Sequence, residues 1–322
     1  MDKQPKAAAQ GSPFWLVALA AGAVFALGLG IRQSQPLFIS AINSQTGVGY
    51  ATLSLAFGIA QLMWGVAQPL AGAVADRWGA RPVMLVGALL VAGATAATPL
   101  ATNAAALILL IGVMAAVGAG TLGQALRQAG RDRSFLLLNA GFFTCGFHVA
   151  FIATHLPGVV AFCQLPPSVS AWSLSLIGLF NILGSLWIGR MIQARRMKIA
   201  LAWTYFARAA IIFAFVLSPK TPLAFYLFAA GIGFTYLSTV PPTVGLVAKL
   251  LGARYLATLF GVVMLSHQVG GFLGAWLGGK AFEASGSYDW MWYADIALCL
   301  GAALVHLPIR EARPAAGALA RA

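Results

Sequence analysis

Two arginines fall inside long apolar stretches of this sequence, where a charge is costly unless something compensates it. Arg32 stands beside a Gln-Ser-Gln run, late in the stretch 14–40. Arg208 lies about 15 Å into the stretch 199–217, at roughly 1.5 Å per helical residue. An arginine in such a place usually faces a protein interior or an aqueous cavity, and its guanidinium can grip a carboxylate through two parallel hydrogen bonds. Both arginines are therefore candidates for binding an anionic solute.

Each arginine also has a purely structural interpretation. Arg32 is near enough to the end of its stretch for the side chain to reach the outer lipid headgroups. Arg208 is too deep for that, but Asp295 lies in another apolar stretch and needs a partner as well. An Arg208–Asp295 pair is one way to compensate both charges.

Other polar side chains in apolar stretches are His148, His155, His267 and Gln268. His148 and His155 are seven residues apart and share a helix face, but zinc ligands are usually closer in sequence and more numerous, so no metal site is predicted. His148 is interpreted instead as a cavity residue or proton relay. His267 and Gln268 fit either interhelical hydrogen bonds or contact with a substrate or a coupling proton.

The sequence offers no credible catalytic machinery. It has no nucleophile accompanied by a base and an orienting acid, and no glycine-rich phosphate loop ending in Gly-Lys-Ser/Thr. We therefore predict that the protein is not an enzyme, has no cofactor and is not an ATP-driven pump. Cys145, Cys163 and Cys299 form no Cys-x-x-Cys motif and are interpreted as small apolar fillers.

Composition explains why charges in apolar stretches matter here. Of 322 residues, 60% are hydrophobic and 8% charged, and the mean hydropathy is +0.86. Soluble chains carry about 25% charged residues, so this chain could not cover a surface in water, and the lipid bilayer is its predicted environment. A spanning helix needs about 20 apolar residues. Ten stretches qualify: 14–40, 50–72, 82–101, 104–123, 134–158, 169–189, 199–217, 223–245, 257–279 and 290–308.

The basic residues predict the topology. If the N-terminus lies inside and the ten stretches alternate, sixteen of the twenty Lys and Arg residues fall in inside segments. Lys220 and Lys280 fall outside, and Arg32 and Arg208 fall within spans. Such an excess marks the cytoplasmic side. It predicts a multi-pass protein of the bacterial inner membrane with both termini cytoplasmic, and it accounts for the net charge of +13 without nucleic acid.

The most specific motif is GAVADRWGAR, Gly72 to Arg81, between the second and third spans. Gly72 and Gly79 allow a tight turn and close helix approach. Asp76 can pair with Arg77 or Arg81 and lie near the N-terminus of the next helix. The motif resembles the Gly-x-x-x-Asp-Arg-x-Gly-x-Arg loop of the major facilitator superfamily, which implies a conformational gate built from these five residues.

The resemblance extends over nearly the whole chain. It implies two six-helix bundles that work by alternating access. The loop between the sixth and seventh spans contains Gly189 and Arg190 but lacks the aspartate of the first loop. The stretch 237–278 is similar to the tenth and eleventh helices of bacterial monocarboxylate and oxalate/formate carriers. In those carriers a basic residue on the first helix serves the anionic substrate, and Arg32 resembles it.

The chain departs from this family in helix number, with ten predicted spans where twelve are normal. The missing pair falls between about 123 and 133, which predicts an all-α membrane bundle of four plus six helices. The predicted domains are an incomplete N-terminal bundle (1–123), a basic cytoplasmic linker (124–133) and a C-terminal bundle (134–322). Near the end of the chain, Gly270, Gly274 and Gly278 form a stripe for close helix packing.

The predicted function is secondary transport of small organic anions such as monocarboxylates, by symport or antiport with a proton or counter-anion. One alternative is efflux of a drug or neutral solute. Another, motivated by the two missing spans, is a truncated protein that does not transport, or an assembly partner of another chain.

Overall fold

The computed structural model describes residues 44, 50–79, 129–252 and 254–311. These residues form helices joined by short turns, without strands. The helices are α3 (Tyr50–Trp78), α7 (Arg133–Phe162), α8 (Pro167–Ala194), α9 (Met197–Leu217), α10 (Pro222–Thr235), α11 (Val240–Leu251), α12 (Leu256–Ser285) and α13 (Asp289–His306). The prediction of an all-helical protein is confirmed. The predicted spans 14–40, 82–101 and 104–123 lie outside the described residues.

Six segments of the described chain are long and apolar enough to cross a bilayer: α3, α7, α8, α9, α12, and α10 together with α11. They correspond to predicted spans two and five to nine. The tenth predicted span, 290–308, is helical as α13, but it is not among the six because Asp289, Asp295 and His306 lower its hydropathy. The six segments agree with an incomplete bundle of the major-facilitator type.

The helices begin and end at residues suited to those positions. Asp132 caps α7 by accepting a hydrogen bond from the Phe135 backbone N–H at 2.8 Å. α12 ends at Gly286, whose φ of 67° is a left-handed conformation that glycine adopts without strain. α7 continues through Pro157, so this proline does not end the helix.

The predicted eighth span is broken in two. α10 ends at Thr235 and α11 begins at Val240, with Tyr236 to Thr239 between them. Pro241 and Pro242, of a residue type that can end or kink a helix, lie in the first turn of α11. A proline is tolerated there because the first helical N–H groups have no partner within the helix. The interruption precedes the prolines.

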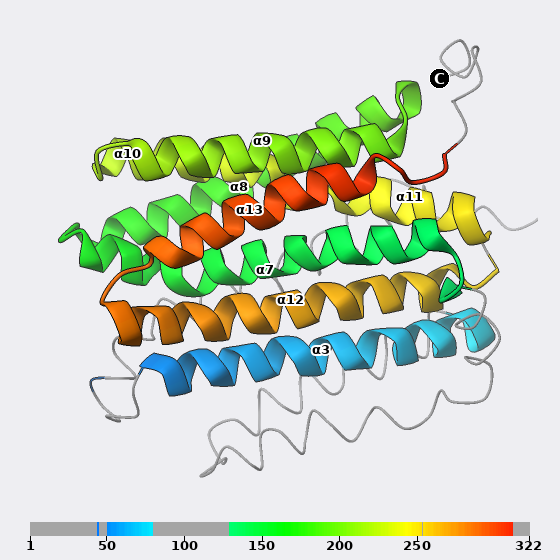
Figure 1. The fold of residues 1–322 in the computed structure, drawn as a ribbon, viewed down its shortest axis with the longest axis horizontal. Coiled ribbons are helices and arrows are strands. Elements are labelled where there is room, and N and C mark those ends of the chain that lie inside the picture. The colour runs from blue at the N-terminus through cyan, green and yellow to red at the C-terminus, as the bar shows by residue number, and fades with distance from the viewer. Residues whose placement is uncertain (1–43, 45–49, 80–128, 253, 312–322) are drawn as a thin grey trace, which may run out of the picture.

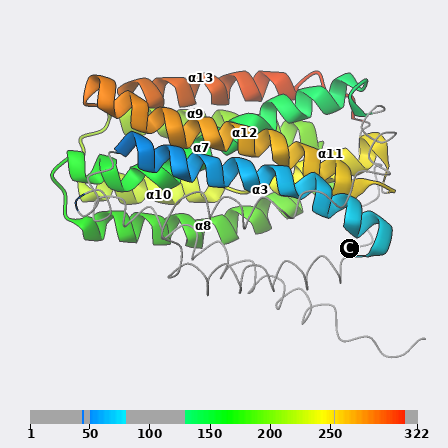
Figure 2. The same cartoon turned by 90° about the horizontal axis from the view of Figure 1, so that it is seen from below.

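The helices lie side by side along the long axis of the molecule (Figure 1). α12 packs against α3 on one side and α7 on the other, α13 packs against α9 and α7, and α10 packs against α8. The view from below shows the same neighbours (Figure 2). α12 is thus the helix that joins α3 to the rest of the described bundle.

The outer faces are apolar. On α8, Trp172, Ile182 and Leu186 are each at least 60% exposed. A soluble protein would rarely display such a surface, whereas lipid tails cover it at no cost. The buried interior contains an aromatic group of Phe151, Phe215, Phe228 and Trp292 and a set of polar side chains.

Candidate functional site

Six polar side chains from three helices meet inside the bundle. We call them the buried polar centre: Cys145 and His148 on α7, Tyr205 and Arg208 on α9, and Asp295 and Cys299 on α13. All six are fully buried. Polar groups remain buried in this way when they bind one another or a ligand, because an unpaired one loses the hydrogen bonds it would make in water.

Arg208 lies against the break between α10 and α11. Its Nη2 donates to the backbone carbonyl of Thr235 and to that of Tyr236, the latter at 3.1 Å. The break leaves these carbonyls without the amide partners that a continuous helix would supply, and the partial negative charge at a helix C-terminus attracts a cation. The guanidinium also stands over the Tyr205 ring, 5.3 Å from its centroid. The broken helix therefore holds Arg208 through Nη2.

Two donor nitrogens of the Arg208 guanidinium are unbonded. Within the described residues, Nε and Nη1 have no hydrogen-bond partner, and no carboxylate forms an ion pair with Arg208. The Tyr205 hydroxyl is likewise buried without a hydrogen bond. Nε and Nη1 lie on opposite sides of the guanidinium from each other, so each can donate a charge-assisted hydrogen bond to an anion.

Asp295 is paired with His148. The distance from His148 Nδ1 to Asp295 Oδ2 is 2.6 Å, and both side chains are 0% exposed. The Cys299 thiol lies 3.7 Å from the other carboxylate oxygen. The hypothesis that Asp295 compensates Arg208 directly thus gives way to a different arrangement, in which the histidine compensates the carboxylate.

His148, Asp295 and Cys299 come close enough to resemble a metal site, with ligand atoms within 4.8 Å of one another. Two of these ligand atoms are already bonded to each other. The fixed charge of Arg208 also acts on both His148 and Cys299, which disfavours a divalent cation. We assign the three residues to a hydrogen-bonded group and propose no metal.

His148 and His155 contact different helices although they share the inward face of α7. His155 Nε2 lies 2.7 Å from the Ala275 carbonyl of α12. Its ring occupies the space that a Cβ at Gly278 would need. His155 is therefore part of the α7–α12 packing, whereas His148 faces α13.

His267 and Gln268 face different neighbouring helices, His267 toward α7 and Gln268 toward α3. The His267 ring lies 5.1 Å from that of Phe142 on α7, and its Nδ1 has no hydrogen-bond partner. The Gln268 amide is fully buried and unbonded, and the side chain packs where Gly65 of α3 leaves room. Gln61 of α3 approaches the same place, since both amides lie next to Gly271. Gln61 was not a candidate from the sequence.

The predicted stripe Gly270, Gly274 and Gly278 faces α7. A Cβ on the first two would lie 2.0 Å and 2.2 Å from the carbonyl oxygens of Phe143 and Phe147. Gly146 on α7 approaches the His267 carbonyl of α12 in the same way. Glycine is needed here because the two backbones are in contact.

The motif at the end of α3 contacts α12. Asp76 accepts hydrogen bonds from the Thr258 N–H at 2.8 Å, from the Thr258 hydroxyl at 2.6 Å and from the Ala257 N–H at 3.3 Å. It therefore caps the first turn of α12, with Thr258 182 positions away in sequence, rather than forming an ion pair with Arg77. The helix expected after the motif, 82–101, lies outside the described residues, so the contact of Asp76 with its N-terminus stays a prediction. Arg81 lies outside the described residues.

The rest of the motif supports this contact. A Cβ at Gly72 would be 2.4 Å from the Ala257 carbonyl, so glycine lets α3 approach α12. Gly79 ends the helix with a φ of 85°. Arg77 stacks on the adjacent Trp78 ring at 4.9 Å. Arg32 cannot be placed, because it too lies outside the described residues.

The opposite end of the α3–α12 pair has a matching cap. Glu283, near the end of α12, accepts a hydrogen bond from the Ala51 N–H in the first turn of α3 at 2.9 Å. The two antiparallel helices therefore cap each other, with a carboxylate near the C-terminal end of each binding the N-terminus of the other. Nothing in the sequence pattern around Glu283 indicated this contact.

Several residues of the buried polar centre were missed or misread from the sequence. Cys145 was interpreted as an apolar filler, yet its sulfur lies 3.2 Å from the Thr239 hydroxyl. One signal could have found the centre: each contributing helix carries its polar pair one turn apart. Cys145 and His148 are three residues apart, as are Tyr205 and Arg208, and Asp295 and Cys299 are four apart.

Apolar outer faces around buried polar groups, with six segments able to cross a bilayer, define a multi-pass helical membrane protein. No protein-family profile matches the chain. It is similar to an uncharacterised MFS-type transporter, YcxA of Bacillus subtilis (strain 168), with 23% identity over 165 residues. The match covers 49% of this chain and 40% of that relative. It supports the major facilitator superfamily and a general transporter role, and it does not distinguish a branch.

Proposed function

We propose that this protein is a secondary transporter that carries small organic anions, monocarboxylates among them, by alternating access. The observation that carries the proposal is the pair of unbonded donors on Arg208. This guanidinium is fully buried, its Nη2 is held by Thr235 and Tyr236, and its Nε and Nη1 have no hydrogen-bond partner among the described residues. A carboxylate would accept a charge-assisted hydrogen bond from one of these donors and neutralise the charge.

A route to Arg208 is supported by the other unbonded polar groups. Cys145 lies next to both Arg208 and His267. His148 Nε2 on α7 and His267 Nδ1 on α12 have no hydrogen-bond partner among the described residues. Gln268, the neighbour of His267 in sequence, meets Gln61 of α3. Unbonded buried polar atoms thus run from α9 across α7 and α12 to α3. Groups of this kind need water or solute to complete their hydrogen bonds, as expected along a transport path.

The proposed moving interface is that between α3 and α12. Its two end contacts, Asp76 with Thr258 and Glu283 with Ala51, lie about one bilayer thickness apart, since α12 spans 30 residues at 1.5 Å each. Opening one while the other stays closed would expose the interior to one side only. The gate role of Gly72, Asp76, Arg77, Gly79 and Arg81 is part of this proposal.

The orientation is also proposed: inner membrane, with both termini cytoplasmic. At one end of the bundle lie the start of α7 and the end of α13, with Arg133 and Arg310, and the loop between α8 and α9, with Arg195. Lys220 and Lys280 lie at the other end. The basic residues are thus sorted by membrane face, as the positive-inside rule requires. Labelling a cysteine introduced at Gly79 from each side of the membrane tests this orientation.

Uptake into proteoliposomes tests the function. Labelled monocarboxylates, dicarboxylates and a neutral sugar are offered to the wild type, to Arg208→Gln, to Arg208→Lys and to the exposed-site control Arg190→Gln. We expect saturable uptake of carboxylates alone and a loss of about 100-fold in Arg208→Gln, since a hydrogen bond between charged groups is worth up to about 3 kcal/mol. Arg208→Lys should recover part of the uptake. Arg190→Gln should behave as wild type.

Two outcomes would contradict the proposal. If folded wild-type protein carries no carboxylate, the substrate class is wrong. If Arg208→Gln transports as well as Arg190→Gln while both have wild-type melting temperatures, Arg208 is not the anion anchor.

A further inference from the structure

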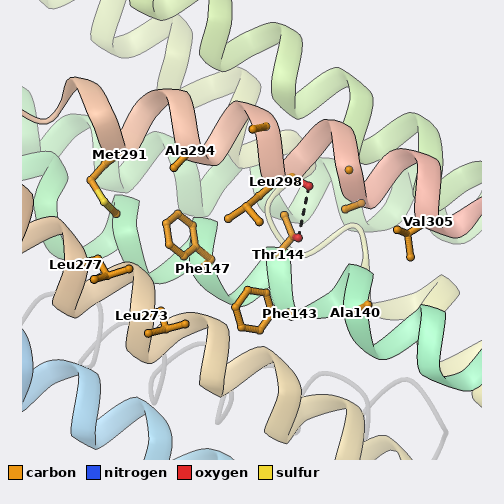
Figure 3. Close-up of a pocket in the computed structure, with 13 residues that line it drawn as sticks. Ala140, Phe143, Thr144, Phe147, Leu273, Leu277, Met291, Ala294, Leu298 and Val305 are labelled. Carbon is orange, nitrogen blue, oxygen red and sulfur yellow. Dashed lines mark hydrogen bonds between the residues drawn. The ribbon is translucent and has the colours of Figure 1, made fainter.

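The outer side of α7 carries an apolar groove bounded by α12 and α13 (Figure 3). Its volume is about 700 Å³, and its lining includes Phe143 and Phe147 of α7, Leu273 of α12, and Leu298 and Val305 of α13. Figure 3 shows these side chains turned into the space between the helices. The groove is separate from the buried polar centre, with which it shares no lining residue.

The groove is open because small residues line the α13 wall. Gly301 lies on that wall, and a Cβ there would meet no atom within 4 Å. The lining runs from Met291 to Val305, about 21 Å along the helix at 1.5 Å per residue. One leaflet of a bilayer core is about 15 Å thick, so the groove can accept an extended acyl chain over its whole length.

Three arginines gather where α7 begins and α13 ends, beyond one mouth of the groove. The Arg310 backbone N–H donates to the Ser134 hydroxyl at 3.0 Å, which fixes it beside Arg133. Arg131 lies two residues earlier, and all three side chains are exposed. Ala140 of the groove is seven residues into α7 from Arg133, about 10 Å away along the helix.

The nearby acidic groups are committed elsewhere. Asp132 binds the Phe135 N–H and caps α7. Glu311 binds the Met197 and Lys198 N–H groups at the start of α9 and the Lys249 ammonium. Among the described residues, the three arginines form no ion pair. The apolar groove therefore ends at a patch of positive charge that has no ion-pair partner among the described residues.

We propose that this groove binds an anionic glycerophospholipid, with one acyl chain between α12 and α13 and the phosphate headgroup against Arg131, Arg133 and Arg310. The occupant needs an apolar chain long enough to fill the groove and a negative charge at one end, and anionic membrane lipids supply both. A soluble anion would use only the arginines, and a second copy of the protein would use only the apolar walls.

Native mass spectrometry of the detergent-purified protein tests the proposal. Phosphatidylglycerol and phosphatidylcholine with identical acyl chains are titrated, and retained lipid is counted. We expect tighter binding of phosphatidylglycerol. An interfacial arginine contributes about 1 kcal/mol toward an anionic lipid, so Arg133→Gln with Arg310→Gln should lower that affinity about 30-fold and leave phosphatidylcholine unchanged.

A steric pair separates the groove from the general lipid surface. Gly301→Leu places a side chain in the groove, and Gly178→Leu adds the same side chain on exposed α8, where a Cβ also meets nothing within 4 Å. We expect Gly301→Leu to abolish selective retention and Gly178→Leu to keep it, with both variants monodisperse. Equal affinity of the wild type for the two lipids would overturn the headgroup assignment. Unchanged retention by Gly301→Leu would overturn the assignment of the lipid to the groove. If the wild type is a dimer and Gly301→Leu is a monomer, the groove binds a second copy instead.

Discussion

The α3–α12 interface and the buried polar centre differ in where their hydrogen bonds lie. Between α3 and α12, Asp76 and Glu283 form hydrogen bonds at the two ends. In the middle, the backbones approach closely at glycines, and the Gln268 amide and the Gln61 amide oxygen have no hydrogen-bond partner among the described residues. In the polar centre, the bonds cross the middle of the bundle, from His148 to Asp295 and from Arg208 to the helix break.

This difference has mechanical consequences. A helix pair bonded at its ends and smooth in between can open at one end with the loss of a few hydrogen bonds, because glycine contacts carry no interlocking side chains. A bundle bonded through its middle cannot separate without leaving buried charges unpaired, which is far more costly. Hydrogen bonds from the Ser266 hydroxyl to the Asn139 carbonyl and from His155 to the Ala275 carbonyl join α12 to α7. We therefore expect α7, α9 and α13 to move as one body with α12 and to rock against α3.

Cross-linking gives the largest expected contrast. Ala51 and Gly279 lie across the α3–α12 interface, with 3.2 Å from a Gly279 Cβ to the Ala51 Cα. Asn139 and Ser266 lie across the α7–α12 interface, where the Ser266 hydroxyl donates to the Asn139 carbonyl oxygen at 2.9 Å. In a Cys163→Ser background, both cysteine pairs should form disulfides. Only Ala51→Cys with Gly279→Cys should abolish carboxylate uptake, with recovery on reduction.

The Asn139→Cys and Ser266→Cys pair is the control for this experiment, because it joins α12 to a helix of the same proposed body. Wild-type-like uptake by both oxidised pairs would show that α3 does not move against α12. Loss of uptake in both would show that the division into two bodies is drawn in the wrong place.

The second contrast concerns stability and uses two aspartates of α13. Asp295 is fully buried and paired with His148, whereas Asp289 is exposed in the first turn. Asp295→Ala should lower the free energy of unfolding by about 3 kcal/mol, because it leaves a buried polar partner unpaired. Asp289→Ala should cost about 0.5 kcal/mol through the lost helix-terminus interaction. Thermal unfolding in detergent measures both, and similar losses would argue against a rigid centre.

The helices of the described region were predictable because each is an apolar run of the length a bilayer requires. The ends were less so: α12 runs to Ser285, six residues beyond the predicted 279, since a polar helix end can project from the membrane. The position of the break, Tyr236 to Thr239, could not be located from the sequence because its residues are themselves mostly apolar or small. It is stabilised from a distance, by Arg208 and by the Asn181 amide oxygen, which accepts from the Leu237 N–H at 3.1 Å.

Single residues of the candidate site could be predicted from the sequence, but the partners that they contact could not. A charge at membrane depth singled out Arg208, and a motif singled out Asp76. Their partners are 28 and 182 positions away, and nothing in local spacing encodes such distances. The count of ten spans and the role of Arg32 remain predictions, because they rest on residues outside the described part of the chain.

The smallest expected effects come from the two end caps. The informative result is which end of the α3–α12 interface opens in each variant. Asp76→Asn removes a charged cap of about 1 kcal/mol from the α12 N-terminus, and Glu283→Gln removes the corresponding cap from α3. Each should favour opening at its own end by about fivefold. A cysteine at the buried Ala73 should then label faster in Asp76→Asn, and one at the buried Ala51 faster in Glu283→Gln.

Lys280→Gln is the matched control for the second cap. It removes a charge three residues from Glu283 whose ion pair, at 3.9 Å and exposed, contributes little. We expect its labelling rates to equal those of the wild type at both ends. If Asp76→Asn and Glu283→Gln instead raise labelling at the same end, the two caps do not act as opposed gates. The α3–α12 interface would then open as a whole, and its end bonds would differ from those of the polar centre in position but not in role.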